Sequence, residues 1–214
     1  MSLVGLAGVI LAAGESSRMG RDKALLPWPK ASGRADILDR PAGTILSAAI
    51  RALSAYCDLV IVIAGKNEAA LQPVAYACGA SVVRNPAPER GQFSSLQTGL
   101  HEVLNLGRDS AMVTLVDRPP PRHETLSALV TAFERREHAV WAVVPENASK
   151  HGHPILIGRE MIEAFLRAPV TANARDIEHA NQQRIRYVPV EDPLVTTNVD
   201  TPNDYDSLKS IERS

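Results

Sequence analysis

The chain has 214 residues, 23 basic and 24 acidic side chains and a formal net charge of −1, with 45% hydrophobic and 22% charged residues. This composition excludes a disordered chain, and the length is that of one domain, able to bury roughly 70% of its unfolded surface without disulfides or a structural metal. The nearly neutral balance argues against a general nucleic-acid binder, although it allows a local basic pocket for a phosphorylated ligand.

The start of the chain is apolar over residues 3–11 but carries no positively charged leader. Such a run is too short to span a bilayer and does not resemble a secretory signal, so we interpret it as a buried first strand. The two cysteines, Cys57 and Cys78, form neither a CxxC pair nor a cluster with zinc spacing. We expect both to be small buried side chains, with a disulfide or a catalytic thiol as alternatives. Free cysteines are typical of a reducing compartment, so we expect a cytoplasmic location.

Further apolar runs rich in Val, Ile and Leu alternate with segments of helical spacing. Because polar alternation is absent from these runs, each predicts a strand buried on both faces. The predicted strands are residues 3–11, 59–64, 80–83, 111–116 and 139–144, and the predicted helices are 44–55, 68–77, 94–105 and 124–136. This alternation predicts an α/β fold built from βαβ units, with a mostly parallel sheet.

The last third of the chain is less regular. Short strands are predicted at residues 154–157 and 185–190, and short helices at 159–166 and 172–180. A final helix is signalled more clearly, because Thr201 can cap it, Pro202 suits its first position and Asp204 can complete a capping box. No repeat divides the chain, so we expect a single domain over residues 1–214, with one long unpatterned loop at 29–43 close to the site.

In such a fold, ligands bind at the carboxyl ends of the strands, near a switch in strand order. The loop after the first strand, residues 11–23, combines two glycines and two serines with Arg18 and Lys23. Its backbone N–H groups can wrap a polyphosphate, and its cations can bind one. It matches neither GxGxxG nor GxxxxGK[ST], since Ala24 follows Lys23. From composition alone, a solvated turn with incidental charges is an open alternative.

The first loop, LAAGESSRMGRDK, resembles the signature LAAG-x-S-x-R-M-G-x-x-K of nucleotidyltransferases of the molybdenum-cofactor cytidylyltransferase type, within the MobA-like NTP transferases. Four later segments are similar to the family's motifs, in the family's order. They are N-P followed by G-Q-F-S-S-L-Q-T-G at residues 85–99, V-D-R-P at 116–119, G-H-P at 152–154 and N-V-D-T-P at 198–202. The resemblance implies a three-layer Rossmann-like nucleotidyltransferase fold.

The implied reaction is attack of an acceptor phosphate on the α-phosphate of an NTP, with loss of pyrophosphate. An anion must approach a polyanion, so the site needs N–H donors, cations and a divalent metal. The resemblance implies catalytic Arg18 and Lys23; nucleotide-binding Leu11, Ala12, Ala13, Gly14, Ser94, Ser95 and Gly99; Asp117 and Asp200 as Mg²⁺ ligands; and His153 on the acceptor side.

Several of these residues have a purely structural alternative. Ser94, Ser95 and Asp117 can serve as helix caps, and Asp200 can complement the dipole of the last helix. His151 and His153 lack an obvious third metal ligand nearby.

Two features depart from the resembled family. Arg118 stands where the family often carries Gln or Met, and three prolines follow it at residues 119–121. Residues 31–43 look like an insertion that carries Arg34, Asp36, Asp39 and Arg40. The first departure leaves the identity of the acceptor open.

The form LAAG is typical of the cytidylyl branch of the family, and LAGG of the guanylyl branch. The methyl group of Ala13 narrows the space beside the nucleotide, which favours a pyrimidine. We therefore expect CTP as donor, a molybdopterin-type cofactor as acceptor and a cofactor-receiving enzyme as a candidate partner, without nucleic acid or membrane. The alternatives are transfer to a phosphorylated sugar, alcohol or hydroxy acid, and a nucleotide-binding partner in cofactor maturation that does not catalyse transfer.

Overall fold

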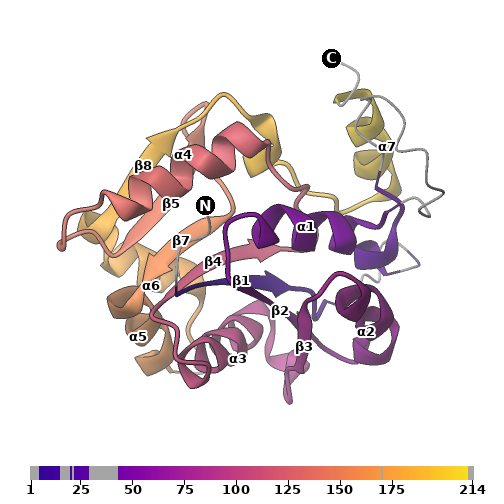
Figure 1. Ribbon diagram of the computed structural model, residues 1–214, viewed down its shortest axis with the longest axis horizontal. Coiled ribbons are helices and arrows are strands. Elements are labelled where there is room, and N and C mark those ends of the chain that lie inside the picture. Colours follow the sequence, from indigo (N-terminus) through magenta and orange to yellow (C-terminus); the bar gives the residue numbers. More distant parts are fainter. Residues whose placement is uncertain (1–4, 15–19, 21, 29–42, 170, 212–214) are drawn as a thin grey trace.

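A mixed sheet of eight strands lies between two layers of helices in the described part of the chain (Figure 1). The computed structural model describes residues 5–14, 20, 22–28, 43–169 and 171–211, with the side chains of 209–211 excepted. The strands are β1 (Leu6–Leu11), β2 (Leu59–Ala64), β3 (Ser81–Arg84), β4 (Ser110–Leu115), β5 (Ala142–Asn147), β6 (Lys150–His151), β7 (Ile155–Gly158) and β8 (Ile185–Pro189). The helices are α1 (Ile45–Ser54), α2 (Glu68–Ala77), α3 (Gln92–Asn105), α4 (His123–Glu134), α5 (Arg159–Arg167), α6 (Ala174–Ala180) and α7 (Pro202–Ile211).

The strand order is β3-β2-β1-β4-β7-β5-β6, and β8 pairs with β5. The first four strands run parallel, whereas β7 is antiparallel to both of its neighbours, β4 and β5. The predicted α/β fold is confirmed, with the parallel pairing concentrated in the first half of the chain. From β1 the chain moves outward to β2 and β3, then returns to β4 on the other side of β1. This change of direction opens a crevice at the carboxyl ends of β1 and β4.

Alternate residues of β1 face the two helical layers. Leu6 and Ile10 pack into a core with α1, α2 and α4, while Val9 and Leu11 pack into a core with α3 and α5. All six residues of β1 are buried, as its continuous apolar run predicts. The central strand is therefore held on both faces, and the loop that follows it starts from a rigid base.

Most predicted elements are found within a few residues of their expected bounds, with three differences. β3 is an edge strand whose terminal residues Ser81 and Arg84 are exposed, so it is not buried on both faces. α3 begins at Gln92, which places Ser94 inside the first turn and leaves Gly91, at φ 87°, as the N-cap. The strand predicted at residues 139–144 lies at Ala142–Asn147, and it forms a hairpin with β6, a strand that the sequence analysis does not predict.

Thr44 caps α1, and the predicted cap of the last helix at Thr201 is confirmed. The Thr44 side chain accepts a hydrogen bond from the Ser47 amide, at 3.1 Å. The Asp204 amide donates to Thr201 Oγ1 at 3.2 Å, and the Asp204 carboxylate accepts from the Thr201 amide at 2.7 Å. These bonds fix the start of α7, directly after Asp200.

Two further features bear on the expectations above. Cys57 is buried, Cys78 is partly buried, and both are free thiols, so the alternative of a disulfide between them is excluded. Across the ranges that the structure describes, no helix has the length and apolar character needed to cross a bilayer.

Candidate active site at the ends of β1 and β4

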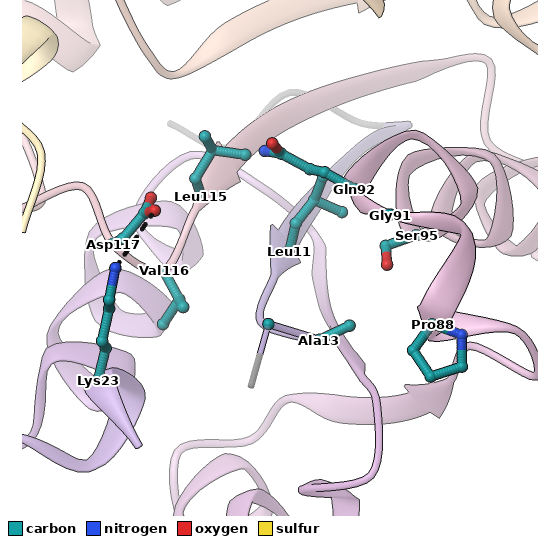
Figure 2. A pocket seen from close by; sticks show the side chains of 11 residues that line it. Leu11, Ala13, Lys23, Pro88, Gly91, Gln92, Ser95, Leu115, Val116 and Asp117 are labelled. Atoms are coloured by element: carbon teal, nitrogen blue, oxygen red, sulfur yellow. Dashed lines mark ion pairs between the residues drawn. The ribbon is translucent and has the colours of Figure 1, made fainter. Parts of the chain in front are cut away.

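A pocket of about 210 Å³ opens at the carboxyl ends of β1 and β4 (Figure 2). The two strand ends lie side by side, because Leu11 pairs with Leu115 and the Val116 amide donates to Leu11 O at 3.0 Å. The pocket is lined by Leu11, Ala13, Gly14, Lys23, Pro88, Gly91, Gln92, Ser95, Leu115, Val116 and Asp117. It therefore lies at the switch point in strand order, where a ligand is expected.

The loop after β1 supplies one wall of this pocket. Ala13 and Gly14 line it, as the sequence predicts for nucleotide-binding residues. Ala12 differs from the expectation, because its amide donates to Ile63 O at 2.8 Å and its carbonyl accepts from Asn67 Nδ2 at 2.9 Å. Both of its backbone groups are thus used within the protein. Arg18, predicted to contact the phosphates, lies outside the described residues, as do the insertion residues Arg34, Asp36, Asp39 and Arg40.

Lys23 reaches the pocket from a short 3-10 helix, Lys23–Leu25. Asp22 caps this turn by accepting from the Ala24 amide at 2.9 Å. Asn67, just after β2, donates both to Asp22 Oδ2, at 2.6 Å, and to the carbonyl of Ala12. One amide side chain therefore ties the end of β1 to the turn that carries Lys23. Sequence reasoning missed both Asp22 and Asn67; the available signal was the preference of Asp for the N-cap position.

The Lys23 ammonium joins two carboxylates from distant parts of the chain. Its Nζ lies 2.8 Å from Asp200 Oδ1 and 3.9 Å from Asp117 Oδ2, the ion pair drawn in Figure 2. The Val199 amide donates to Asp117 O at 2.8 Å, which holds the segment before Asp200 against the end of β4. α7 strengthens this arrangement, because Tyr205 and Leu208 pack in a cluster with Val199. The two carboxylates predicted as metal ligands are thus brought together.

The environment of Asp117 favours an additional cation. Burial raises the pKa of Asp117; the Lys23 charge lowers it, and the nearby Asp200 carboxylate raises it again. Its Oδ1 is buried and has no hydrogen-bond partner in the described structure. A carboxylate oxygen in this state is suited to a metal ion or to a further donor.

The donor set fits Mg²⁺ better than a metal that needs a complete protein cage. No group of three or more His, Cys, Asp or Glu side chains that could hold a metal occurs among the described residues. Mg²⁺ requires only one or two carboxylates, since waters and substrate phosphates complete its shell. A closed zinc site would need four protein ligands. Asp117 and Asp200 therefore fit a magnesium–nucleotide complex.

The residues predicted to lie near the base divide into two groups. Ser95 lines the pocket, and its Oγ accepts from Asn85 Nδ2 at 3.0 Å. Ser94 does not line the pocket; its Oγ accepts from Asn85 Nδ2 and lies 2.8 Å from Gly91 O. Ser94 thus holds the turn before α3, in keeping with the structural alternative.

Gly99, predicted to contact the nucleotide, does not line the pocket. It is buried on the sheet side of α3, where an added Cβ would lie 2.8 Å from Val9 Cγ1 and 3.1 Å from Ile63 Cγ1. Glycine at this position permits the close approach of α3 to β1 and β2.

A second cavity, of about 740 Å³, shares Leu11, Gln92 and Leu115 with the first pocket. We call it the acceptor groove, after the role predicted for His153. His153, predicted on the acceptor side, lines it, together with Arg118. Burial and the charge of Arg118 lower the pKa of His153 to about 3, so its imidazole is neutral. His151 lies elsewhere, exposed and stacked on Tyr187 with ring centroids 3.9 Å apart, so the two histidines are in different environments.

Comparison with known proteins agrees with this geometry. The family model "MobA-like NTP transferase domain" matches residues 8–188. "Probable molybdenum cofactor guanylyltransferase" from Mycobacterium avium is 34% identical over 125 residues, which cover 58% of this chain but only 56% of that protein. Molybdenum cofactor cytidylyltransferase from Escherichia coli is 25% identical over 206 residues and 94% of each chain.

Solved structures show the same fold. Rv0371c from Mycobacterium tuberculosis H37Rv superimposes with a TM-score of 0.75 at 24% identity, over 96% of this chain and 98% of that one. A second Rv0371c structure, in complex with manganese, gives a TM-score of 0.67 at 22% identity, over 95% and 97% of the two chains.

Proposed function

This chain belongs to the family of MobA-like NTP transferase domains, which are nucleotidyltransferases, and we propose that it transfers CMP from CTP to a molybdopterin-type cofactor. A phosphate oxygen of the acceptor would form a bond to the α-phosphorus of CTP. The bond between the α-phosphorus and the bridging oxygen to the β-phosphate would break, and pyrophosphate would carry away the electron pair. The product would hold the two partners through a phosphoanhydride.

The observation that carries this proposal is the contact of Lys23 with both Asp200 and Asp117 beside the pocket. Phosphoryl transfer requires positioned charge more than covalent participation by the protein. The Ala13 and Gly14 backbone would bind the nucleotide, and Lys23 would stabilise the charge that develops on its phosphates. Asp117 and Asp200 would hold Mg²⁺, which supplies charge neutralisation and orientation of the phosphates when it is bound.

The preference for CTP rests on Ala13. This residue lines the smaller of the two cavities, at about 210 Å³, and its carbonyl lies close to Gly65, directly after β2. An added Cβ at Gly65 would lie 2.7 Å from Ala13 O, so the backbone here has little room to move aside. The methyl group of Ala13 would therefore limit the size of the base. The Escherichia coli cytidylyltransferase, similar over 94% of this chain, supports the same choice.

A second candidate function is transfer of GMP from GTP. It is favoured by the guanylyltransferase name of the Mycobacterium avium relative, which is 34% identical over the aligned part. That alignment covers 56% of the relative and 58% of this chain, whereas the alignment with the cytidylyltransferase covers 94% of both. We therefore place CTP first.

Donor competition tests the proposal. Purified protein with Mg²⁺ and a molybdopterin acceptor would receive equal concentrations of CTP, GTP and ATP, and the nucleotide joined to the acceptor would be identified by mass spectrometry. We expect the CMP adduct to dominate, together with a matching release of pyrophosphate. Dominance of the GMP adduct would support the second candidate. Absence of any adduct, with phosphorylated sugars, alcohols and hydroxy acids tried as well, would contradict nucleotidyl transfer.

A further inference from the structure

The acceptor groove contains two buried side-chain nitrogens without a hydrogen-bond partner. They are Arg118 Nε and His153 Nδ1, and the third such atom in the described part of the chain is Asp117 Oδ1. Buried polar atoms are nearly always paired, so an unpaired one in a native protein calls for an explanation. All three belong to the two adjoining cavities, and none lies elsewhere among the described residues. This distribution indicates that a bound molecule satisfies them.

The carbonyl of Val195 anchors the two residues that carry these nitrogens. It accepts from Arg118 Nη1 at 3.1 Å and from the His153 amide at 2.9 Å. Gly152 permits this approach, since an added Cβ would lie 2.3 Å from the same oxygen. The guanidinium of Arg118 and the backbone of His153 are therefore held by one atom.

The segment that carries Val195 is itself anchored. Buried Asp192 caps it by accepting from the Leu194 amide at 3.1 Å. The same carboxylate accepts from the Arg122 amide and from Thr125 Oγ1, both at 2.8 Å, at the start of α4. Arg118 and His153 thus belong to a preorganised unit rather than to two independent surface side chains.

The chemistry of the unpaired atoms selects an anion. Arg118 Nε–H can only donate, and its guanidinium carries a permanent positive charge. His153 is neutral, so one of its ring nitrogens carries a proton and can donate as well. Two donors and one positive charge match a phosphate better than a neutral group. Arg118 also directly follows Asp117, which places it at the border between the nucleotide pocket and the acceptor groove.

We propose that Arg118 and His153 bind the attacking phosphate of the acceptor, with Arg118 Nε–H as the main donor and His153 Nδ1–H as the second. This inference rests on the proposed function and specifies its acceptor as a phosphate monoester. The negative charge of that phosphate opposes its approach to the nucleotide. Arg118 offsets this repulsion on the acceptor side, as Lys23 does on the donor side.

Binding of phenyl phosphate, a simple phosphate monoester, tests this assignment. The ligand is titrated into the full chain with Mg²⁺, both with and without α,β-methylene CTP, and followed by ¹⁵N NMR of arginine Nε–H groups. The Arg118 signal is identified by its loss in Arg118→Gln. Inorganic phosphate and benzoate serve as comparison ligands. Arg167→Gln is the matched control, because it removes one exposed positive charge on α5 outside both cavities.

We expect a saturable shift of the Arg118 Nε–H signal, and phenyl phosphate affinity at least about tenfold weaker in Arg118→Gln, as for loss of a charge-assisted hydrogen bond. Arg118→Lys should retain part of the affinity, and Arg167→Gln all of it. Melting temperatures near that of the wild type would show that the variants fold.

Two results would overturn the inference: equal phenyl phosphate affinity in Arg118→Gln and the wild type, or equal affinity of the wild type for benzoate. Failure of the wild type to bind α,β-methylene CTP would instead contradict the proposed function. The titration without nucleotide still tests Arg118 in that case.

Discussion

The Nζ atom of Lys23 lies 2.8 Å from Oδ1 of Asp200, although 177 residues separate the two in the chain. Lys23 follows the first strand, and Asp200 precedes the last helix. The ammonium is nearly buried and the carboxylate is one-third exposed, so the pair is less screened by solvent than a surface ion pair. This contact links a residue near the start of the chain to one near its end, beside the pocket.

Replacing Lys23 with alanine should reduce turnover by about 10²–10³, the usual effect of losing one donor to the transition state. It should also lower the melting temperature, because Asp117 and Asp200 would lose the charge that lies between them. Pyrophosphate release and thermal unfolding check these effects, with Lys150→Ala, an exposed residue of β6, as control. Arg18→Ala should reduce turnover in the same direction. Unchanged turnover with a lower melting temperature would show that Lys23 is structural only.

Replacing Asp117 with asparagine should reduce transfer by roughly 10²–10³ without loss of the fold. Asparagine keeps the shape but lacks the charge that holds Mg²⁺. Because burial raises the pKa of Asp117, a neutral side chain there should not destabilise the protein. Turnover at saturating Mg²⁺ provides the measurement, and Asp109→Asn removes an exposed carboxylate as the control. Wild-type turnover in Asp117→Asn would exclude it as a metal ligand.

Replacing Ala13 with glycine should weaken the preference for CTP over GTP. Loss of the methyl group relieves overpacking against a purine, a cost of about 1–3 kcal/mol, or roughly 5–150-fold in preference. The ratio of kcat/KM for the two donors, with one working acceptor, measures this change. Ala128→Gly on α4, outside the nucleotide pocket, is a control for a general effect of the substitution. An unaltered ratio would show that Ala13 does not select the base.

The free energy of unfolding should fall as the pH decreases from about 6.5 toward 3, partly because of His153. Its pKa is about 3 in the folded protein, below its ordinary value of 6.5. In this window the unfolded chain binds a proton that the folded chain does not, so acid favours unfolding, by at most about 1.4 kcal/mol per pH unit. Above pH 6.5 both states are neutral at this residue and it contributes no pH dependence.

Urea unfolding of the wild type and of His153→Gln, between pH 7.5 and 4, isolates this contribution, since the other titrating groups are common to both proteins. We expect a shallower pH dependence in the variant. Parallel curves would show that His153 binds a proton equally well in the folded and unfolded protein, which contradicts the lowered pKa.

Local sequence pattern was enough to predict the α/β fold. The continuous apolar runs of β1, β2 and β4 predict buried strands because a parallel sheet covered on both faces needs no polar alternation. The caps at Thr44 and Thr201 also follow from local chemistry, since each bond spans three residues. Ala13, Gly14 and Lys23 were named from the resemblance of the first loop to the family signature, and all three line the pocket.

Contacts between distant residues were decided only by the tertiary structure. Three such sets of contacts join separate elements. Lys23 pairs with Asp200, and Asn67 donates to Ala12 and Asp22. Arg118 and the His153 amide both donate to the Val195 carbonyl. The burial of Gly99 against Val9 and Ile63 likewise depends on how α3 crosses the sheet. No local periodicity encodes these distances, because they depend on strand order and helix packing. The sequence thus determined the elements and the residue types at their ends, while packing decided which side chains meet and which buried atoms are left for a ligand.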